Sequence, residues 1–404
     1  MSLNKIVAHL DMDSFFATVE QQANPRLRGK AIVVSGKEGS RSVIVASSKE
    51  AKKLGIKTGM LHFEARKLCP DLCFVEPDGD KYNTLHHRIV ESIARYVPNF
   101  EVFSIDELFL DFSACRNFSE AINLAKKIKL ELKKVLGSWL TCSVGIAENK
   151  LMAKLASDLK KPDGIMVVDE SNLETILSSA KLKDFCGVGC SINARLDALG
   201  IDSVLKLREY PQSALLKEFG PVGADFLFHL ARGQGQVELA SAFEKVQPQS
   251  VGRSYTLAKN TSDKVDFLSV LAQLIEQVVV EMRRQKLSAK RFLVYLRYAD
   301  FSGKVFSWPG SSFGFDGEKI FFAVQNTIDN FVLPKMVRLV GVRAENLIPV
   351  GNQQSLWEKD RKKLSLLTKI DEINRRYGDF VIKPAYLLKT TKMRRHVGGF
   401  KLYD

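Results

Sequence analysis

The stretch EVFSIDELFLDFS, residues 101–113, alternates apolar and polar residues in the way typical of a β-strand with one face on a hydrophobic core. Acidic side chains are unusual in such a position, because carboxylates are rarely buried without a partner. This stretch nevertheless carries three of them close together, Asp106, Glu107 and Asp111. It therefore predicts a core strand whose acidic residues have partners or a function that explains their position.

A second strand with acidic residues lies upstream, in IVAHLDMD at residues 6–13. It runs directly into SFFATVEQQA, whose phenylalanines and valine recur at helical spacing, so Asp11 falls at the end of a strand. Two β-branched runs follow, AIVVSG and RSVIVASS, and the KEGS between them predicts a hairpin. A short helix is expected over residues 49–54.

Downstream of the acidic strand, apolar residues repeat every three or four positions over residues 119–136, and Gly137 is a natural helix stop. LTCSVGIA is again typical of a strand, and residues 149–161 are again helical in pattern, with Asn149 as the N-cap. This β-α-β-β-α-β order, interrupted by an insertion over about residues 12–75, predicts a ferredoxin-like sheet. The acids would gather on one face of that sheet.

The rest of the chain divides into three further segments. Residues 167–235 are mostly helical in pattern and include FCGVGCSINARLDALGI, a Gly-Val-Gly turn between two helical stretches. A second α+β unit is expected over residues 243–350, with strands at RSYTLA, RFLVYLRYA and MVRLVGVRA around one long helix. Residues 351–404 show a polar break, one helix and a basic end.

The formal net charge of +14 is unevenly distributed along the chain. Residues 1–240 contribute +2, residues 241–350 contribute +5 and residues 351–404 contribute +7. A near-neutral first part followed by basic segments fits a catalytic body joined to parts that grip a polyanion. Membrane binding is disfavoured, because no basic amphipathic helix with a bulky apolar face stands out.

Composition excludes several classes of protein. With 45% hydrophobic and 26% charged residues, the chain is expected to be globular and to bury sizeable cores. No apolar run reaches the roughly 18 residues of a membrane span, and the N-terminus lacks a signal-peptide pattern, so we expect a cytoplasmic protein. The six cysteines are too few for a secreted disulfide framework and are expected to be reduced.

Two pairs of cysteines are closely spaced, Cys69 with Cys73 and Cys186 with Cys190. Such spacing can indicate zinc, but no second pair lies near either of them at a suitable distance. We therefore expect buried thiols at all four positions.

The acids Asp11, Asp106 and Glu107 suggest a specific chemistry. Magnesium prefers oxygen ligands, and carboxylates from two adjacent strand ends can converge on it without long loops. Two magnesium ions on shared carboxylates can activate a 3′-hydroxyl and neutralise a triphosphate, as nucleotidyl transfer requires. The alternative is that these acids are solvated strand-end residues, and short motifs alone do not decide between the two interpretations.

Longer motifs carry more weight: HLDMDSFFATVE, SIDELFLDFS and SVGIAENKLMAKLASDLKKPDGI. In their order and spacing, the chain closely resembles the Y-family translesion DNA polymerases over roughly residues 5–350, most of all the bacterial polymerase IV branch. The resemblance implies a multidomain α+β right hand, with a ferredoxin-like palm, small fingers, a helical thumb containing a helix-hairpin-helix, and an α+β little finger. It assigns residues 1–11 and 76–166 to the palm, 12–75 to the fingers, 167–235 to the thumb, 243–350 to the little finger and 351–404 to a C-terminal tail.

The resemblance also implies the catalytic residues. Asp11, Asp106 and Glu107 would hold two Mg²⁺ ions, with the backbone carbonyl of Met12 as a further ligand. Asp13 would be a solvated neighbour and not a ligand.

Four other residues of the polymerase site are implied in the same way. Phe16 falls on the steric-gate position, where an aromatic ring lies against the sugar C2′ and excludes a ribose hydroxyl, although a core phenylalanine is the ordinary alternative. Lys161 matches the lysine that reaches the incoming triphosphate. Lys49 and Lys52 stand where polymerase IV relatives usually have Tyr and Arg; they can still bind the triphosphate, but without arginine's bidentate fork.

Contacts to DNA are expected from two segments. The Gly-Val-Gly turn resembles a helix-hairpin-helix, in which Gly187 and Gly189 would let backbone N–H groups approach a DNA phosphate. In the second α+β unit, Arg253, Arg291 and Arg297 lie in or beside strands with aromatic residues, so a strand face could track the DNA backbone. Among these arginines, Arg253 is the predicted DNA-binding residue.

The segment NQQSLW, residues 352–357, resembles the bacterial peptide that binds the sliding clamp. Gln353, Leu356 and Trp357 would fill a pocket on the clamp, because exposed Leu and Trp are otherwise costly in a polar linker. The alternative is docking onto the following helix, whose apolar face was expected to carry Leu367, Ile370 and Tyr377.

The sequence thus predicts a monomeric, low-fidelity DNA polymerase that adds deoxynucleoside triphosphates to a primer on template DNA, bypasses damaged bases and binds a sliding clamp. One alternative is a clamp-bound DNA-binding protein whose altered fingers have weakened its catalysis. A nucleotide cyclase, which also uses acids on a ferredoxin-like palm, is a second alternative, but it leaves the thumb turn, the basic C-terminal half and the clamp-like peptide without a role.

Overall fold

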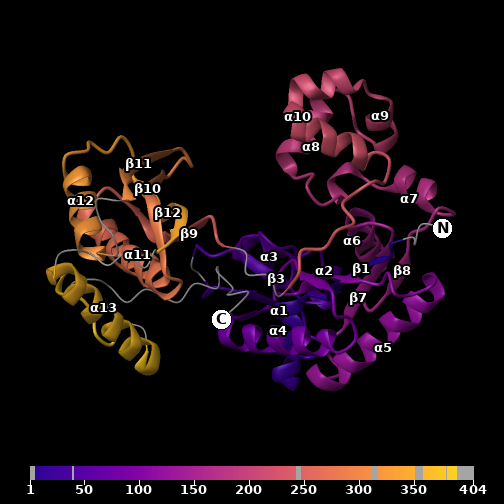
Figure 1. The fold of residues 1–404 in the computed structure, drawn as a ribbon, viewed down its shortest axis with the longest axis horizontal. Helices are drawn as coiled ribbons and strands as arrows, with labels where there is room; N and C mark the ends of the chain where they lie inside the picture. The colour runs from indigo at the N-terminus through magenta and orange to yellow at the C-terminus, as the bar shows by residue number, and fades with distance from the viewer. Residues whose placement is uncertain are drawn as a thin grey trace. The chain divides into compact units, whose positions relative to one another are not determined.

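The structure is a computed structural model that describes residues 5–38, 41–242, 247–310, 316–350, 358–378 and 380–388. The described residues up to 242 form one compact unit, and those from 247 onward form a second (Figure 1). No helix within these ranges combines the length and the apolar character needed to cross a membrane.

A five-stranded sheet in the order β5-β6-β1-β7-β8 is the centre of the first unit. Its strands are β1 (Val7–Met12), β5 (Phe100–Val102), β6 (Glu107–Asp111), β7 (Cys142–Ala147) and β8 (Ile165–Val167). Strand β1 is antiparallel to both β6 and β7. The order β7-β1-β6-β5 is that of a ferredoxin-like sheet, so the predicted palm topology is confirmed.

Helices cover both faces of this sheet. Helices α4 (Gly79–Ala94) and α5 (Phe118–Leu136) bury Ile89 and Ile128 with Leu10 and Leu110 of the strands. Helix α6 (Lys150–Leu159) packs on the opposite face and begins at Asn149, whose side chain accepts a hydrogen bond from the Met152 N–H. The N-cap at Asn149 is therefore as predicted.

The insertion after β1 forms a separate small sheet in the order β3-β2-β4. Strands β2 (Ile32–Ser35) and β3 (Ile44–Ser47) are antiparallel, which confirms the predicted hairpin, and β4 (Cys73–Val75) is parallel to β2. The helices of this region are α1 (Phe15–Ala23), α2 (Lys49–Lys53) and α3 (His62–Leu68), with the 3₁₀ turn η1 (Pro25–Leu27).

The region after β8 is helical, as its pattern predicts. It contains α7 (Leu173–Ser179), η2 (Leu182–Asp184), α8 (Cys190–Ala198), α9 (Val204–Glu209) and α10 (Gln212–Leu230). Helix α10 bends where Gly220 takes a positive φ of 72° just before Pro221. A proline inside a helix removes one hydrogen bond and crowds the preceding turn, so a break at this point is expected.

The second unit is a four-stranded antiparallel sheet with its helices on one face. Its strands, in the order β11-β10-β12-β9, are β9 (Ser250–Thr261), β10 (Leu287–Tyr298), β11 (Gly303–Pro309) and β12 (Val337–Pro349). The helices α11 (Lys264–Arg284) and α12 (Gly317–Asp329) contribute Phe267 and Val324 to its core. Three strands were predicted, and β11 was missed because most of its side chains are exposed.

The C-terminal segment belongs to this second unit and includes α13 (Glu358–Tyr377) and η4 (Ala385–Leu387). Arg283 of α11 pairs with Asp371 of α13 at 2.7 Å. Leu387 is buried in the core of the unit. The predicted apolar face of the helix is partly wrong: Leu367 and Ile370 are half-buried, but the Tyr377 side chain is 65% exposed.

A tyrosine completes the attachment of this C-terminal segment. The ring of Tyr386 stacks on Phe321 of α12 with 5.1 Å between centroids. Its hydroxyl donates a 2.7 Å hydrogen bond to the buried carboxylate of Glu276, which also accepts one from Arg283 at 3.0 Å. A buried carboxylate that loses a donor costs more than an exposed one, because no water replaces the bond.

We expect Tyr386→Phe to lower the free energy of unfolding by about 1–3 kcal/mol, because the ring stacking is kept while Glu276 loses a buried donor. Denaturant unfolding of the full chain measures this, and Tyr377→Phe is the matched control because that side chain is exposed. Equal stability of the two variants would contradict the buried role of the hydroxyl.

Candidate active site

The antiparallel register of β1 and β6 brings the three predicted acids together. Asp11, near the end of β1, lies directly opposite Glu107, the first residue of β6. The backbone N–H of Met12 donates to the carbonyl of Asp106 at 3.0 Å, which fixes the turn before β6 against the end of β1. Residues almost 100 positions apart thus share one edge of the sheet.

Each acid has a hydrogen-bonding partner, and for Asp11 and Glu107 that partner is a lysine from another part of the unit. The Lys161 ammonium lies 2.7 Å from Asp11 Oδ2 and 2.7 Å from Asp158 Oδ1. Lys154 of α6 lies 2.6 Å from Glu107 Oε2. The Ser104 hydroxyl donates to Asp106 at 2.7 Å. Helix α6 and the turn after it therefore supply the positive charge of the site.

The pKa values of these three acids are shifted in different directions. Burial raises the pKa of Asp11 to about 7, with smaller contributions from Glu107 and Asp106 and against the effect of Lys161. It also raises the pKa of Asp106, although the Ser104 hydrogen bond opposes the shift. For Glu107 burial is outweighed by contacts with His9 and Lys154, which lower its pKa to about 2.

This donor set is chemically suited to a hard divalent cation. Its oxygens come from carboxylates, and the raised pKa values of Asp11 and Asp106 show that the site favours added positive charge. Among the residues that the structure describes, no three His, Cys, Asp or Glu side chains are grouped closely enough to hold a metal ion. Lysine ammonium groups occupy the positions beside Asp11 and Glu107 instead.

Asp13 was expected to be solvated, and this was wrong. The residue is only 3% exposed. Its carboxylate accepts hydrogen bonds from the Thr141 hydroxyl at 2.6 Å, the Ser143 hydroxyl at 2.8 Å and the Asp163 N–H at 2.8 Å. Since its oxygens already bind three donors, Asp13 ties β1 to β7 and to the turn after α6.

The two lysines of the insertion that were predicted to bind a triphosphate, Lys49 and Lys52, differ in their environment. Lys49 donates a 2.6 Å hydrogen bond to the Thr141 hydroxyl, which in turn donates to Asp13. The pKa of Lys52 is lowered by burial and by the positive charge of Lys161. Lys52 is thus the lysine whose ammonium shares the electrostatic environment of Lys161, whereas the Lys49 ammonium is bound to Thr141.

Phe16 lies on the first turn of α1, just beyond the acids. Its half-buried ring stacks on the buried ring of Tyr82 with 4.5 Å between centroids and 24° between planes. The Tyr82 hydroxyl donates to Glu20 at 2.8 Å, and Lys81 pairs with Glu20 at 2.7 Å. The ring of Phe16 therefore packs against the Tyr82 ring, which its hydrogen bond to Glu20 holds in place.

Sequence reasoning missed His9 and Lys154. His9 is fully buried, with its ring Nδ1 2.8 Å from the Ser157 hydroxyl and Nε2 3.8 Å from Glu107 Oε2. The second distance exceeds a good hydrogen bond. The alternation of IVAHLDMD was the available signal, because it places His9 on the same strand face as Asp11.

The Gly-Val-Gly turn precedes α8 as expected. Gly187 has a positive φ of 97°, and a Cβ there would lie 2.7 Å from the ring of Phe226, so only glycine fits without movement. Gly189 is the N-cap of α8. The expectation that Cys186 and Cys190 are buried was wrong, because both are exposed, while Cys69 and Cys73 are half-buried.

In the second unit, Arg253 does not share a face with the other two arginines. It lies opposite the buried Val342 and contributes to the lowered pKa of Glu281 on α11, so it belongs to the helix-covered side. Arg291 and Arg297 lie on the open face, which also carries Tyr295 and Arg343. The expectation of a single face was therefore wrong for Arg253.

The predicted clamp-binding residues Gln353, Leu356 and Trp357 lie outside the described residues.

Comparison with known proteins agrees with this architecture. Residues 10–158 match the impB/mucB/samB family, and residues 248–356 match the C-terminal domain of that family. The DNA polymerase IV of Desulfatibacillum aliphaticivorans is 31% identical over 402 residues, covering 97% of this chain and 98% of that protein. The DNA polymerase IV of Alkalilimnicola ehrlichii is 32% identical over 356 residues, covering 88% of this chain and 98% of that protein.

Solved structures give the same result. A Y-family DNA polymerase chimera of Dbh and Dpo4 superposes with a TM-score of 0.71 at 27% identity, covering 85% of this chain and 99% of that one. An insertion ternary complex of Dbh DNA polymerase superposes with a TM-score of 0.56 at 27% identity over the same shares of the two chains.

Proposed function

Because the chain belongs to the impB/mucB/samB family of Y-family DNA polymerases, we propose that it is a template-directed polymerase that extends primers with deoxynucleoside triphosphates, including past damaged template bases. The observation that carries this proposal is the convergence of Asp11, Asp106 and Glu107 at the edge where β1 meets β6. We propose low fidelity and a cytoplasmic, monomeric enzyme on the same family relationship.

The acids are proposed to hold two Mg²⁺ ions together with the carbonyl of Met12. When bound, the metals would polarise the primer 3′-hydroxyl and neutralise charge on the triphosphate. The chain contributes the placement of the acids, since the register of β1 and β6 sets Asp11 against Glu107. Asp11 is buried and the other two acids are half-buried, so water would screen the attraction to a bound cation only in part.

Lys161 is proposed to bind the triphosphate, and its present partners suggest how. Its ammonium lies between Asp11 and Asp158, each 2.7 Å away. Once another cation neutralises Asp11, Lys161 can keep Asp158 and turn its remaining donors to a phosphate oxygen. Lys52 shares this electrostatic environment and is the second proposed triphosphate contact, with Lys49 as the third.

We expect Asp106→Ala to lower the rate of primer extension with magnesium by at least about 10²-fold, because charge developing on the substrate loses a fixed partner. Asp111→Asn is the matched control on the far end of β6, where the Asp111 carboxylate accepts from Asn99 and the Ser113 N–H. The assay uses intact and abasic templates.

In that assay, extension by Asp106→Ala at the wild-type rate would refute the metal assignment. Failure of the wild-type protein as well would favour the DNA-binding alternative, for which the fold and the comparisons offer no support.

Phe16 is proposed as the steric gate against ribonucleotides. The stack on Tyr82 holds its ring rigidly, and a gate must be rigid because a ring that rotates away would admit the 2′-hydroxyl.

We expect Phe16→Ala to reduce the preference for deoxyribonucleotides over ribonucleotides by at least about 10-fold, since the steric exclusion of one hydroxyl is lost. Single-nucleotide insertion with each substrate measures the ratio. Phe16→Tyr is the control, because it keeps the ring and should keep the preference. Unchanged discrimination in Phe16→Ala would eliminate the gate assignment.

DNA binding is proposed for two surfaces, one in each unit. Backbone N–H groups at Gly187 and Gly189 would contact a phosphate at the start of α8. In the second unit, the open sheet face with Arg297 and Arg343 is better suited to a DNA backbone than Arg253, which lies on the helix-covered side.

Clamp binding through Gln353, Leu356 and Trp357 stays a proposal from sequence. We expect capture on immobilised sliding clamp to be lost in the double variant Leu356→Ala, Trp357→Ala, because its apolar anchors are removed. The matched control is Leu366→Ala, Tyr377→Ala, which removes two exposed side chains of α13. Full capture of the first double variant would exclude this peptide as the anchor.

A further inference from the structure

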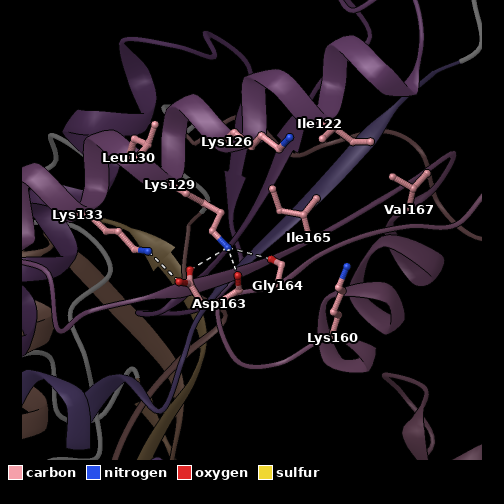
Figure 2. A pocket seen from close by; sticks show the side chains of 10 residues that line it. All are labelled: Ile122, Lys126, Lys129, Leu130, Lys133, Lys160, Asp163, Gly164, Ile165 and Val167. Atoms are coloured by element: carbon pink, nitrogen blue, oxygen red, sulfur yellow. Dashed lines mark hydrogen bonds and ion pairs between the residues drawn. The ribbon is translucent and has the colours of Figure 1, made fainter.

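The turn that carries Lys161 is held by a buried lysine, Lys129. The turn covers residues 160–164, between α6 and β8. Lys129 reaches it from α5, and Figure 2 shows its ammonium directed at the backbone of the turn. Among the residues that the structure describes, Lys129 is the only buried lysine, with 8% of its surface exposed.

The contacts of Lys129 satisfy all three of its donors. Its Nζ donates to the Asp163 carbonyl at 2.6 Å and to the Gly164 carbonyl at 3.1 Å, and it pairs with Asp163 Oδ1 at 3.0 Å. Lys133, one turn further along α5, pairs with Asp163 Oδ2 at 2.8 Å. A buried ammonium is costly unless it is fully paired, so these bonds fix the turn to α5.

The opposite side of the turn is anchored by Asp13. Its Oδ2 accepts the Asp163 N–H at 2.8 Å, and its other contacts are the Thr141 and Ser143 hydroxyls. Asp163 also has a positive φ of 58°, a conformation that Asp adopts more readily than most residues. The backbone at Asp163 is thus held from the sheet side and from the helix side at once.

These two anchors determine where Lys161 lies. Lys161 is two residues before Asp163, and its ammonium is 2.7 Å from Asp11 Oδ2. A flexible lysine side chain reaches many positions, so the position of its backbone decides how often the ammonium is beside the acids. Rigid support of this kind is what separates a productive site from a loose one.

We propose that Lys129 is a positioning residue for nucleotide binding, acting through Lys161. The inference rests on the proposed role of Lys161 toward the triphosphate and extends it to a residue on the far side of the turn. Lys126, Lys133 and Lys160 line, together with Lys129, an open surface pocket of about 620 Å³. Figure 2 shows these side chains. Lys129 differs from Lys126 and Lys160, which are exposed, and from Lys133, which pairs with the Asp163 side chain, because its ammonium also donates to two backbone carbonyls of the turn.

The test is single-nucleotide insertion by the full chain, with Lys129→Met compared with Lys126→Met from the same helix. Methionine keeps the length of the side chain and removes its donors. We expect Lys129→Met to raise the KM for the nucleotide by about 10-fold with a smaller change in kcat, because a displaced Lys161 binds the triphosphate less often. Lys126→Met, at an exposed position, should match the wild type.

A double-mutant cycle separates positioning from a general loss of structure. In a Lys161→Met background, Lys129→Met should raise KM by less than about 2-fold, since the group it positions is gone. A full 10-fold rise in that background would overturn the proposal and leave Lys129 a purely structural residue. If Lys161→Met alone leaves KM unchanged, the proposed role of Lys161 has failed. This single variant therefore tests Lys161 independently of Lys129.

Asp163→Asn provides a second variant if Lys129→Met does not fold. It keeps the backbone carbonyls and tolerates the positive φ, but it removes the ion pairs with Lys129 and Lys133. We expect a rise in KM of about 3-fold that also disappears in the Lys161→Met background. An unchanged KM, or a rise that persists in that background, would overturn the proposal.

Discussion

Three acidic residues at the neighbouring ends of β1 and β6 are the constraint on which the first unit depends. The register of β1 and β6 fixes this closeness, and the backbone bond between Met12 and Asp106 completes it. The negative charges of the three acids repel one another, and this repulsion adds to the rise in the pKa values of Asp11 and Asp106 that burial causes. A chain of ordinary stability tolerates such repulsion only where positive charge is supplied close by.

That positive charge comes from α6 and from the turn after it, and the packing of α6 depends on one glycine. A Cβ on Gly145 of β7 would lie 2.0 Å from the carbonyl oxygen of Ala153, so α6 approaches the sheet as closely as it does only because that side chain is absent. The same helix then carries Lys154 to Glu107, and the turn beyond it carries Lys161 to Asp11. Sheet, helix and turn therefore form one electrostatic assembly.

Much of this arrangement was predictable from sequence, and the exceptions have common causes. Alternation and helical periodicity gave the palm order, the hairpin and the meeting of Asp11 with Glu107, because these follow from local pattern and simple topology. The burial of Asp13 was missed because its partners lie about 130 to 150 positions away. The sheet face on which Arg253 lies depends on the register of an edge strand. A shift of that register by one residue would move its side chain to the other face.

The pairing of acids with lysines also bears on how such a site accepts a charged substrate. A triphosphate that arrived alone would meet the carboxylates, and a cation that arrived alone would have to displace Lys161 from Asp11. With the proposed metal and triphosphate both bound, Asp11 would have a cation as its partner in place of Lys161, and Lys161 would be available to a phosphate oxygen. For this exchange the placement of Lys161 matters as much as its charge, and the buried contacts of Asp13 and Lys129 with the turn are what set that placement.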